Sequence, residues 1–455
     1  MMGTQAVADQ LFYDFCLEDH VPDDHLLRKI DAFLDFDDIR TTLTPYYSHL
    51  GRPSVDPELL IRMLIVGYCF AIRSERRLCE EVHLNLAYRW FCRLGLNDMV
   101  PDHSSFLVNR NGRFRESDIL RLMFESTVER CVTEGLVGGK SFAVDASLIP
   151  ADANKQRSIP GPEWRAMDIP EDAKRAVRDY IQTLDDALYG AASEKQPKFV
   201  SPSDPAAQWT GANRGPAFFS YSTNYLIDTD HAVIMDVEGS RSIRQGEVGA
   251  ANVMIERTEE RFGIKPDSLA ADSAYGSGKN LAWLIDEAKI TPYIPVIDKS
   301  ERKDGIFSRS DFSFDKENNI YICPNGKVLK TTGRVVSGDQ YMYRARVPDC
   351  RVCPLKQTCC PKEPQRKVPR SIYEHARDIA RALAETDEYE IARHNRKKVE
   401  MLFAHLKRIL RLNRLRLRGP NGVQDEFLLA ATAQNLRRLA KLAWKPPDQG
   451  VVVPA

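Results

Sequence analysis

The middle of the chain alternates short apolar runs with helix-like stretches. The run 142–147 carries an acid near its end, 268–272 ends on another acid, and 291–297 supplies a third run. Runs of this length are typical of buried strands, and a hairpin over 225–236 and a helix over about 246–262 are expected between the first two. Strands followed by helix, strand, helix and strand predict a mixed α/β sheet flanked by helices.

Bulk properties limit the class of protein. With 455 residues the chain is too long for one ordinary domain, and 43% apolar with 28% charged residues is typical of globular proteins. The formal net charge is zero, so affinity for nucleic acid must come from local charge asymmetry. The first residues do not read as a signal peptide, and the longest apolar stretch, 59–72, is too short to cross a bilayer. We therefore expect a cytoplasmic protein with no membrane partner.

Short helices with interleaved arginines are expected in the N-terminal part, 1–120. Asp56 and Ser74 look like helix starts, and Gly95 looks like the end of a third helix. This pattern suits a helix-turn-helix-like DNA-binding domain, and a helical packing or dimerisation domain is the alternative. The arginines are Arg62, Arg73, Arg76, Arg77, Arg89, Arg93, Arg110, Arg113 and Arg115.

The segment 393–418 carries ten Lys or Arg residues and one acid, Glu400. Its spacing predicts one helix, ended by the glycines of 419–422, beside an apolar stripe that includes Val399 and Leu406. A lone carboxylate among cations suits a site where the acid holds a metal ion and the cations hold phosphates. The alternative is a solvated basic helix with one salt bridge. The residues expected on the charged face are Arg393, Arg396, Glu400, Lys407, Arg411, Arg414 and Arg418.

Three carboxylates are candidates for catalysis. Asp145 and Asp272 lie at or near the ends of predicted strands, where α/β sheets gather ligand groups, and Glu400 comes from the basic segment. If they converge, they can bind two Mg²⁺ or Mn²⁺ ions about 3.5–4 Å apart and cut phosphodiester bonds. Each aspartate could instead cap a turn.

These residues resemble a known family, the DDE transposases of bacterial insertion sequences. The matching pieces are 144–147, 271–276 and 396–407, with further likeness at 51–114 and 202–205. One subgroup carries a Tyr, Arg, Glu and Lys signature on its catalytic helix. The last three map onto Arg396, Glu400 and Lys407, whereas Arg393 stands at the Tyr position and can contact phosphate there instead.

The resemblance implies an RNase H-like catalytic domain at 138–298 and 371–445, a Cys-rich insertion at 299–370 and a loose tail at 446–455. It implies binding of double-stranded DNA at terminal inverted repeats, cleavage at the element ends and transfer of the 3′-hydroxyl strand to target DNA. A homodimer or higher multimer at the nucleoid of a bacterium is expected, because two ends are joined in one event. The alternatives are a nuclease of the same fold that never joins strands and a non-catalytic DNA-binding regulator.

The expected insertion holds a cluster of cysteines. The close pair Cys350 and Cys353 suits a tetrahedral Zn²⁺ ion, with Cys323 and Cys359 as partners and Cys360 left over. A small polar subdomain has little core, so a structural metal would help it fold. Reduced thiols or a redox-labile pair are the alternatives.

Overall fold

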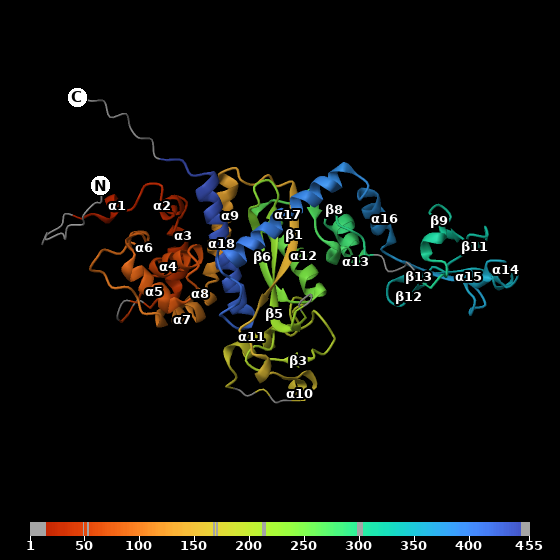
Figure 1. Ribbon diagram of the computed structural model, residues 1–455, viewed down its shortest axis with the longest axis horizontal. Helices are drawn as coiled ribbons and strands as arrows, with labels where there is room; N and C mark the ends of the chain where they lie inside the picture. Colours follow the sequence, from red (N-terminus) through yellow and green to blue (C-terminus); the bar gives the residue numbers. More distant parts are fainter. Residues whose placement is uncertain are drawn as a thin grey trace, which may run out of the picture. The chain divides into compact units, whose positions relative to one another are not determined.

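The computed structural model describes residues 15–48, 50–51, 54–166, 169, 172–211, 215–297 and 304–446 (Figure 1). Three predicted regions lie partly outside the described residues: Arg52 and Pro53 of the helical domain, 299–303 of the insertion and 447–455 of the tail. The chain divides into two compact units, so each unit gathers segments that are far apart in the sequence. The first consists of Met1–Gly138, Ala146–Ile264 and Lys398–Ala455, and the second of Gly139–Asp145 and Lys265–Lys397.

The N-terminal part of the first unit is helical, as predicted. Asp56 and Ser74 cap α4 and α5 by accepting a backbone N–H, so both expected helix starts are confirmed. The helix expected to reach Gly95 ends at Phe91, because Arg93 turns into the left-handed region at φ 58°. The helices are α1 (Leu17–His20), α2 (Leu26–Asp31), α3 (Asp37–Leu43), α4 (Pro57–Cys69), α5 (Glu75–Leu84), α6 (Leu86–Phe91), α7 (Ser104–Asn111), α8 (Arg113–Glu116) and α9 (Ile119–Thr133), with a 3-10 turn at Thr44–Tyr46.

Three of the arginines in this helical part are buried. Arg62, Arg89 and Arg110 are only 4%, 2% and 7% exposed. Their guanidinium groups bond to carboxylates or backbone carbonyls of neighbouring segments. These three residues therefore hold helices together and do not face solvent, so the DNA-contact interpretation is wrong for them. Arg76 and Arg77 are exposed.

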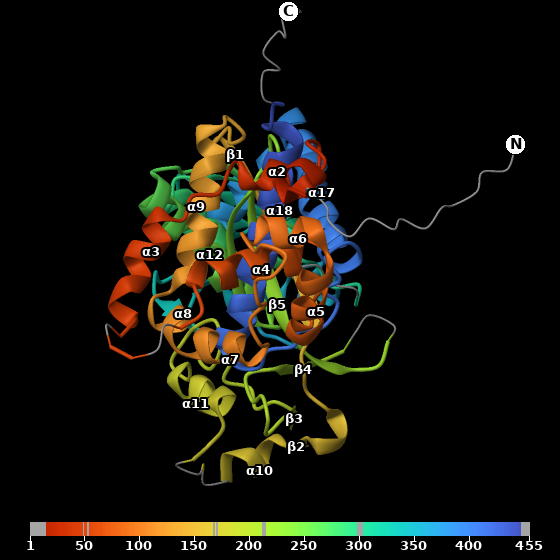
Figure 2. The same cartoon turned by 90° about the vertical axis from the view of Figure 1, so that its left-hand side faces the viewer.

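One long antiparallel hairpin dominates the strands of the first unit. β5 (Phe218–Asp228) and β6 (Ile234–Arg241) pair along most of their length, so the predicted hairpin is confirmed and is longer than expected. Helix α12 (Arg244–Phe262) follows and packs on both strands. Short elements precede the hairpin and lie beyond the lower end of β5 in Figure 2, drawn in yellow. They are a 3-10 turn (Lys155–Arg157), β2 (Ile159–Pro160), α10 (Gly161–Ala166), α11 (Arg175–Gln182), β3 (Phe199–Val200) and β4 (Gln208–Thr210).

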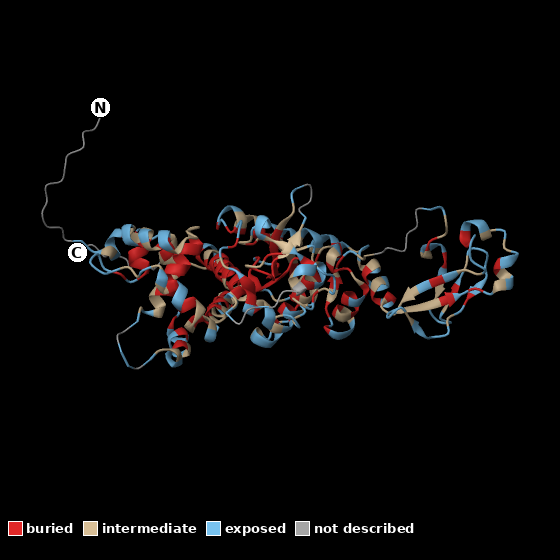
Figure 3. Cartoon of the chain, turned by 90° about the horizontal axis from the view of Figure 1, so that it is seen from below, coloured by how far each residue is buried: buried red, intermediate tan, exposed pale blue. Residues whose placement is uncertain are grey.

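Helix α18 (Gly419–Leu442) forms the buried axis of the first unit, where it packs against α4, α9, α11 and β6. Most of its residues are buried. Figure 3 draws the buried residues of the chain in red. Its amide side chains bond to the backbone of β6. Asn435 accepts from the Ile234 N–H (3.0 Å) and donates to the Ile234 carbonyl (2.8 Å). Gln424 does the same with the Gly239 N–H (2.7 Å) and the Val237 carbonyl (3.0 Å).

The basic segment is not one helix, which corrects the prediction. α17 (Asp387–Arg408) starts earlier than expected and ends at Arg408, and Arg411 takes a left-handed φ of 53°. Leu410, Leu412 and Leu415 are at most 1% exposed. Their spacing of two and three residues would spread them around a helix, so the chain must leave the helix to bury all three. The glycines of 419–422 begin α18 and do not end α17.

The second unit contains three parallel strands. β1 (Ser141–Pro150) starts in this unit and pairs there with β7 (Ser268–Ala270), which pairs with β8 (Thr291–Tyr293). Between β7 and β8 come a 3-10 turn (Ser273–Tyr275), α13 (Gly278–Ala282) and a π-helix (Trp283–Glu287), and α16 (Glu374–Leu383) packs on α13 and β8. Hydrogen-bonded neighbours follow the order β4-β5-β1-β7-β8, with β6 on β5. The predicted mixed α/β sheet is confirmed.

The Cys-rich segment 304–371 also belongs to the second unit and is drawn in teal and cyan in Figure 1. It forms two small three-stranded sheets with strands of two to five residues. The elements are a 3-10 turn (Arg309–Asp311), β9 (Ser313–Asp315), β10 (Ile320–Ile322), β11 (Val328–Leu329), β12 (Val335–Val336), β13 (Gln340–Arg344), α14 (Val347–Arg351), α15 (Lys356–Cys359) and β14 (Lys367–Ser371). Over all the stretches described, no helix is both long and apolar enough to span a membrane.

Candidate active site

Two of the predicted catalytic acids follow the paired residues of β1 and β7. The parallel pairs run from Ser141↔Ser268 to Ala143↔Ala270. Two residues beyond the last pair come Asp145, which is still inside β1, and Asp272, which follows the end of β7. Adjacent strands lie about 4.8 Å apart, and residues two apart face the same side of a sheet. The sequence predicted both acids at or near strand ends. Asp272 does follow the end of β7, whereas β1 continues to Pro150 and Asp145 lies in its middle, which corrects the prediction for Asp145.

Asp145 is held by an arginine of α17. The Arg396 Nη1 lies 3.0 Å from Asp145 Oδ2, and the two side chains are 21% and 18% exposed. A charge-assisted pair with so little contact with solvent is stronger than a surface pair. Arg396 was predicted to contact phosphate, and here its partner is a carboxylate.

Asp272 turns the chain at the end of β7. Its Oδ1 accepts a hydrogen bond from the Ala274 N–H at 2.7 Å and caps the short 3-10 turn that follows. The turn-forming role considered as an alternative is therefore confirmed. It does not exclude a metal role, because a carboxylate offers about four acceptor positions and this bond uses one.

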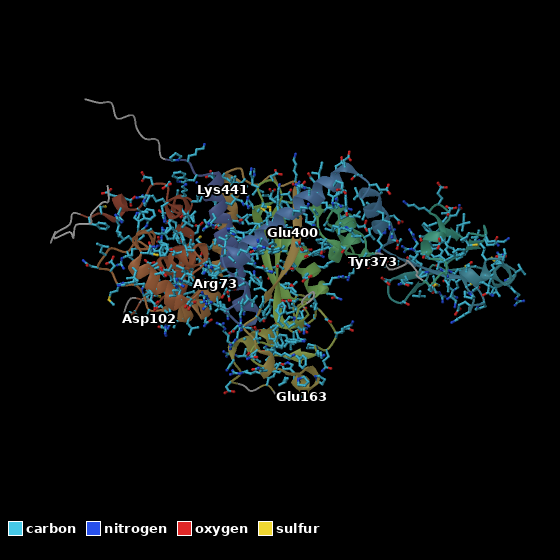
Figure 4. The ribbon with its side chains drawn as sticks, in the orientation of Figure 1. Arg73, Asp102, Glu163, Tyr373, Glu400 and Lys441 are labelled. Carbon is cyan, nitrogen blue, oxygen red and sulfur yellow. The ribbon has the colours of Figure 1, made fainter. Side chains whose placement is uncertain are left out.

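Glu400 lies on α17, one helical turn beyond Arg396, and its side chain is exposed (Figure 4). The predicted apolar stripe beside it is confirmed, since Val399 and Leu406 are fully buried. Buried residues on one side and Glu400 on another give α17 the two faces that the sequence pattern predicted.

Lys407 bonds to β1, the strand that carries Asp145. Its Nζ donates to Ser147 Oγ at 2.7 Å, and burial lowers the pKa of its ammonium group. Ser147 follows Asp145 by two residues and so faces the same side of β1. Arg396 and Lys407 thus bond to two same-face side chains of one strand.

The remaining predicted DNA contacts have mixed surroundings. Arg393 is exposed and pairs with Glu390 at 2.7 Å. Because α17 ends at Arg408, Arg411, Arg414 and Arg418 do not share its charged face. Arg414 and Arg418 both pair with Asp152, at 3.0 and 2.8 Å, and the exposed Arg411 follows the end of the helix. Sequence reasoning missed Asp152, because it lies some 260 residues from its partners and no local pattern links them.

The predicted zinc ligands converge on one small cavity. Its lining includes Cys323, Cys350, Cys353 and Cys359, together with Cys360. All are free thiols. Of the residues that the structure describes, no three His, Cys, Asp or Glu side chains are gathered tightly enough to hold a metal ion, and this applies to the acids as well as the cysteines.

Two parts of the chain match known protein families. Residues 15–112 match the family described as Transposase domain (DUF772), and residues 322–440 match the family described as Transposase DDE domain. The chain is a DDE transposase of the insertion-sequence type. No curated protein matches the transposase.

The two matches cover different parts of the transposase. The first covers α1 to α7, and the second covers most of the Cys-rich segment together with α16, α17 and most of α18. Glu400 lies inside the second match, whereas Asp145 and Asp272 precede it. DDE transposases in general act on DNA and use divalent metal ions. Carboxylate oxygens, as on these three acids, are the ligands that Mg²⁺ and Mn²⁺ prefer.

Proposed function

We propose that the protein binds the terminal inverted repeats of its element, cleaves phosphodiester bonds at the ends and transfers the freed 3′-hydroxyl strand to target DNA. Asp145, Asp272 and Glu400 are the proposed catalytic residues and the ligands of two Mg²⁺ or Mn²⁺ ions. The observation that carries this proposal is the parallel β1–β7 pairing, whose last pair, Ala143↔Ala270, lies two residues before Asp145 on one strand and two residues before Asp272 on the other. Glu400 is supported by its place on α17, one turn from the partner of Asp145.

The strand order supports an RNase H-like catalytic domain. The β5–β6 hairpin is antiparallel, β1 lies next to β5, and β7 and β8 extend the sheet in parallel on the other side of β1. Helices connect β6 to β7 and β7 to β8. The catalytic domain would then comprise 138–298 and 371–445, with 1–120 as the DNA-binding helical domain and 299–370 as an insertion.

The ions would activate water or a 3′-hydroxyl and stabilise the leaving oxygen. The protein's own part is to present oxygens at fixed positions. Asp272 keeps its carboxylate oriented through the Ala274 N–H. Asp145 Oδ2 is bonded to Arg396, so a cation bound at this oxygen would displace the arginine. The released guanidinium is then available to hold a DNA phosphate.

Basic residues around α17 are proposed to hold the DNA backbone. They are Arg393, Arg396, Lys407, Arg411 and Arg414. Most of them have protein partners, namely Glu390, Asp145, Ser147 and Asp152. Binding would exchange these partners for phosphates and release counterions, so affinity should fall steeply with salt. Joining two ends in one event requires at least two active sites, so we propose a homodimer or higher multimer that acts at the bacterial nucleoid.

The test is end cleavage and strand transfer by purified variants. The substrate is a duplex containing one repeat with its flanking DNA, in Mg²⁺ or Mn²⁺. Asp145→Asn, Asp272→Asn and Glu400→Gln should each lower cleavage by at least about a thousandfold while leaving DNA binding nearly intact. Glu388→Gln, which changes another exposed glutamate of α17, is the control and should cleave normally.

Three outcomes would contradict the proposal. Normal cleavage by any one of the three acid variants removes that residue from the site. Cleavage by the wild-type protein without joining of pre-cut ends would indicate a nuclease, and tight binding with no metal-dependent nicking would indicate a regulator.

A further inference from the structure

The Cys-rich segment 304–371 has very little core of its own. Its cluster of buried residues has nine members, three of which are cysteines: Phe312, Tyr321, Leu329, Tyr343, Ala345, Cys350, Cys359, Cys360 and Val368. The strands around this cluster have two to five residues each. Segments of this size with so few buried apolar side chains usually need a disulfide or a metal to hold them together.

The first cysteine of the cluster lies in a tight turn that folds a backbone amide onto its sulfur. The Cys323 N–H donates to the Lys327 carbonyl (2.8 Å), and the Gly326 N–H donates to the Cys323 carbonyl (2.7 Å). Gly326 has a φ of 69°, which suits glycine. As a result the Lys327 N–H points at Cys323 Sγ, at 3.3 Å. This hydrogen bond fixes the position of the Cys323 sulfur within the turn.

The second turn carries Cys350 and Cys353 and bonds to the first. The Cys353 N–H donates to the Cys350 carbonyl (3.4 Å), which bends the chain so that both side chains can face one point. Asn325, from the Cys323 turn, donates through Nδ2 to Cys353 Sγ at 3.5 Å. The Cys353 sulfur therefore lies beside a residue of the turn that carries Cys323, and each of the two sulfurs accepts an N–H donor.

The next turn of chain brings further thiols to the same place. Cys359 ends α15, and the side chains of Cys359 and Cys350 both contact that of Cys360. All five cysteines line one cavity. Three basic side chains line it as well, Lys327, Lys356 and Arg366, and they would offset the negative charge of several thiolates.

We propose that Cys323, Cys350, Cys353 and Cys359 bind one Zn²⁺ ion, which joins the two turns and α15 into a stable subdomain. Four thiolates at about 2.3 Å from a tetrahedral ion make a closed structural site. The sulfurs must draw together from their present positions around the cavity and lose their protons as the ion enters. Cys360, buried against two of the ligands, is not assigned to the ion.

The test measures metal in the purified full-length chain. Elemental analysis should find about one zinc ion per chain. Cys323→Ser and Cys353→Ser should reduce this content at least about fivefold, because each removes one of four ligands. Cys360→Ser and Cys79→Ser, which changes a half-buried cysteine of α5, should keep the full content. Glu400→Gln should also keep its zinc, so failure of this site and failure of the catalytic proposal can be told apart.

A spectroscopic measurement on the wild-type protein tests the site even if the cysteine variants fail to fold. Co²⁺ added to metal-stripped wild-type protein should give the thiolate-to-metal charge-transfer absorption and visible bands of a tetrahedral sulfur site. Absence of zinc from the wild-type protein together with absence of these bands would overturn the site. Zinc lost from Cys360→Ser but kept in Cys359→Ser would overturn the assignment of the fourth ligand.

Discussion

Asp204 should make the stability of the first unit depend on pH. Its side chain is fully buried, and burial raises the pKa of its carboxyl group to about 7. Hydrogen bonds from the Tyr221 hydroxyl and the Gly419 N–H, and the charge of Arg418, favour the anion but do not outweigh burial. The nearby Asp152 adds to the upward shift.

The size of the effect follows from the two pKa values. An acid whose pKa is higher in the folded than in the unfolded state stabilises the fold fully below its unfolded pKa, and this stabilisation is lost as pH rises through the folded pKa. With an unfolded value of about 3.9, the shift of about 3 pH units corresponds to about 4 kcal/mol in total. Of this, about 2–3 kcal/mol should be lost between pH 5 and pH 8.

Asp204→Asn removes the ionisation while keeping an oxygen that can accept from Tyr221 and Gly419. The free energy of unfolding of this variant, minus that of the wild type, should rise by about 2–3 kcal/mol from pH 5 to pH 8. Urea denaturation at closely spaced pH values measures the difference. Asp185→Asn, which neutralises an exposed aspartate of the same unit, is the control. If the curves for Asp204→Asn and wild type run parallel over this range, the reasoning is refuted.

Three further predictions concern packing and DNA contact. Glu426→Gln leaves the buried guanidinium of Arg73 without its countercharge, so it should lower the free energy of unfolding by about 3–5 kcal/mol in urea, and a loss below about 1 kcal/mol would contradict the pairing. Leu412→Ala should lower it by about 2–5 kcal/mol, because Leu412 is fully buried just after α17; a smaller loss would show that the site collapses. Lys407→Met should reduce the slope of log affinity against log salt concentration by about one, as measured by fluorescence anisotropy with DNA from an element end. An unchanged slope would mean that Lys407 bonds to Ser147 and does not contact a DNA phosphate.

Features set by neighbouring residues could be predicted from the sequence, whereas features set by distant contacts could not. The aspartates were found because a short apolar run with an acid at or near its end is a local pattern, and the starts of α4 and α5 because a capping residue acts within three positions. The end of α17 was missed because it depends on where Leu410, Leu412 and Leu415 find a core. Helix spacing alone therefore placed Arg411 and Arg414 on a face that they do not occupy.

Two amide side chains of α18 bond to the backbone of β6 in the way that a neighbouring strand would. β6 is hydrogen-bonded to β5, and Asn435 and Gln424 satisfy donors and acceptors of its backbone at Ile234, Val237 and Gly239. An open strand edge of this kind is a template for joining strands of other molecules. Two side chains of α18 block this route to aggregation, and apolar replacements at these positions would reopen it.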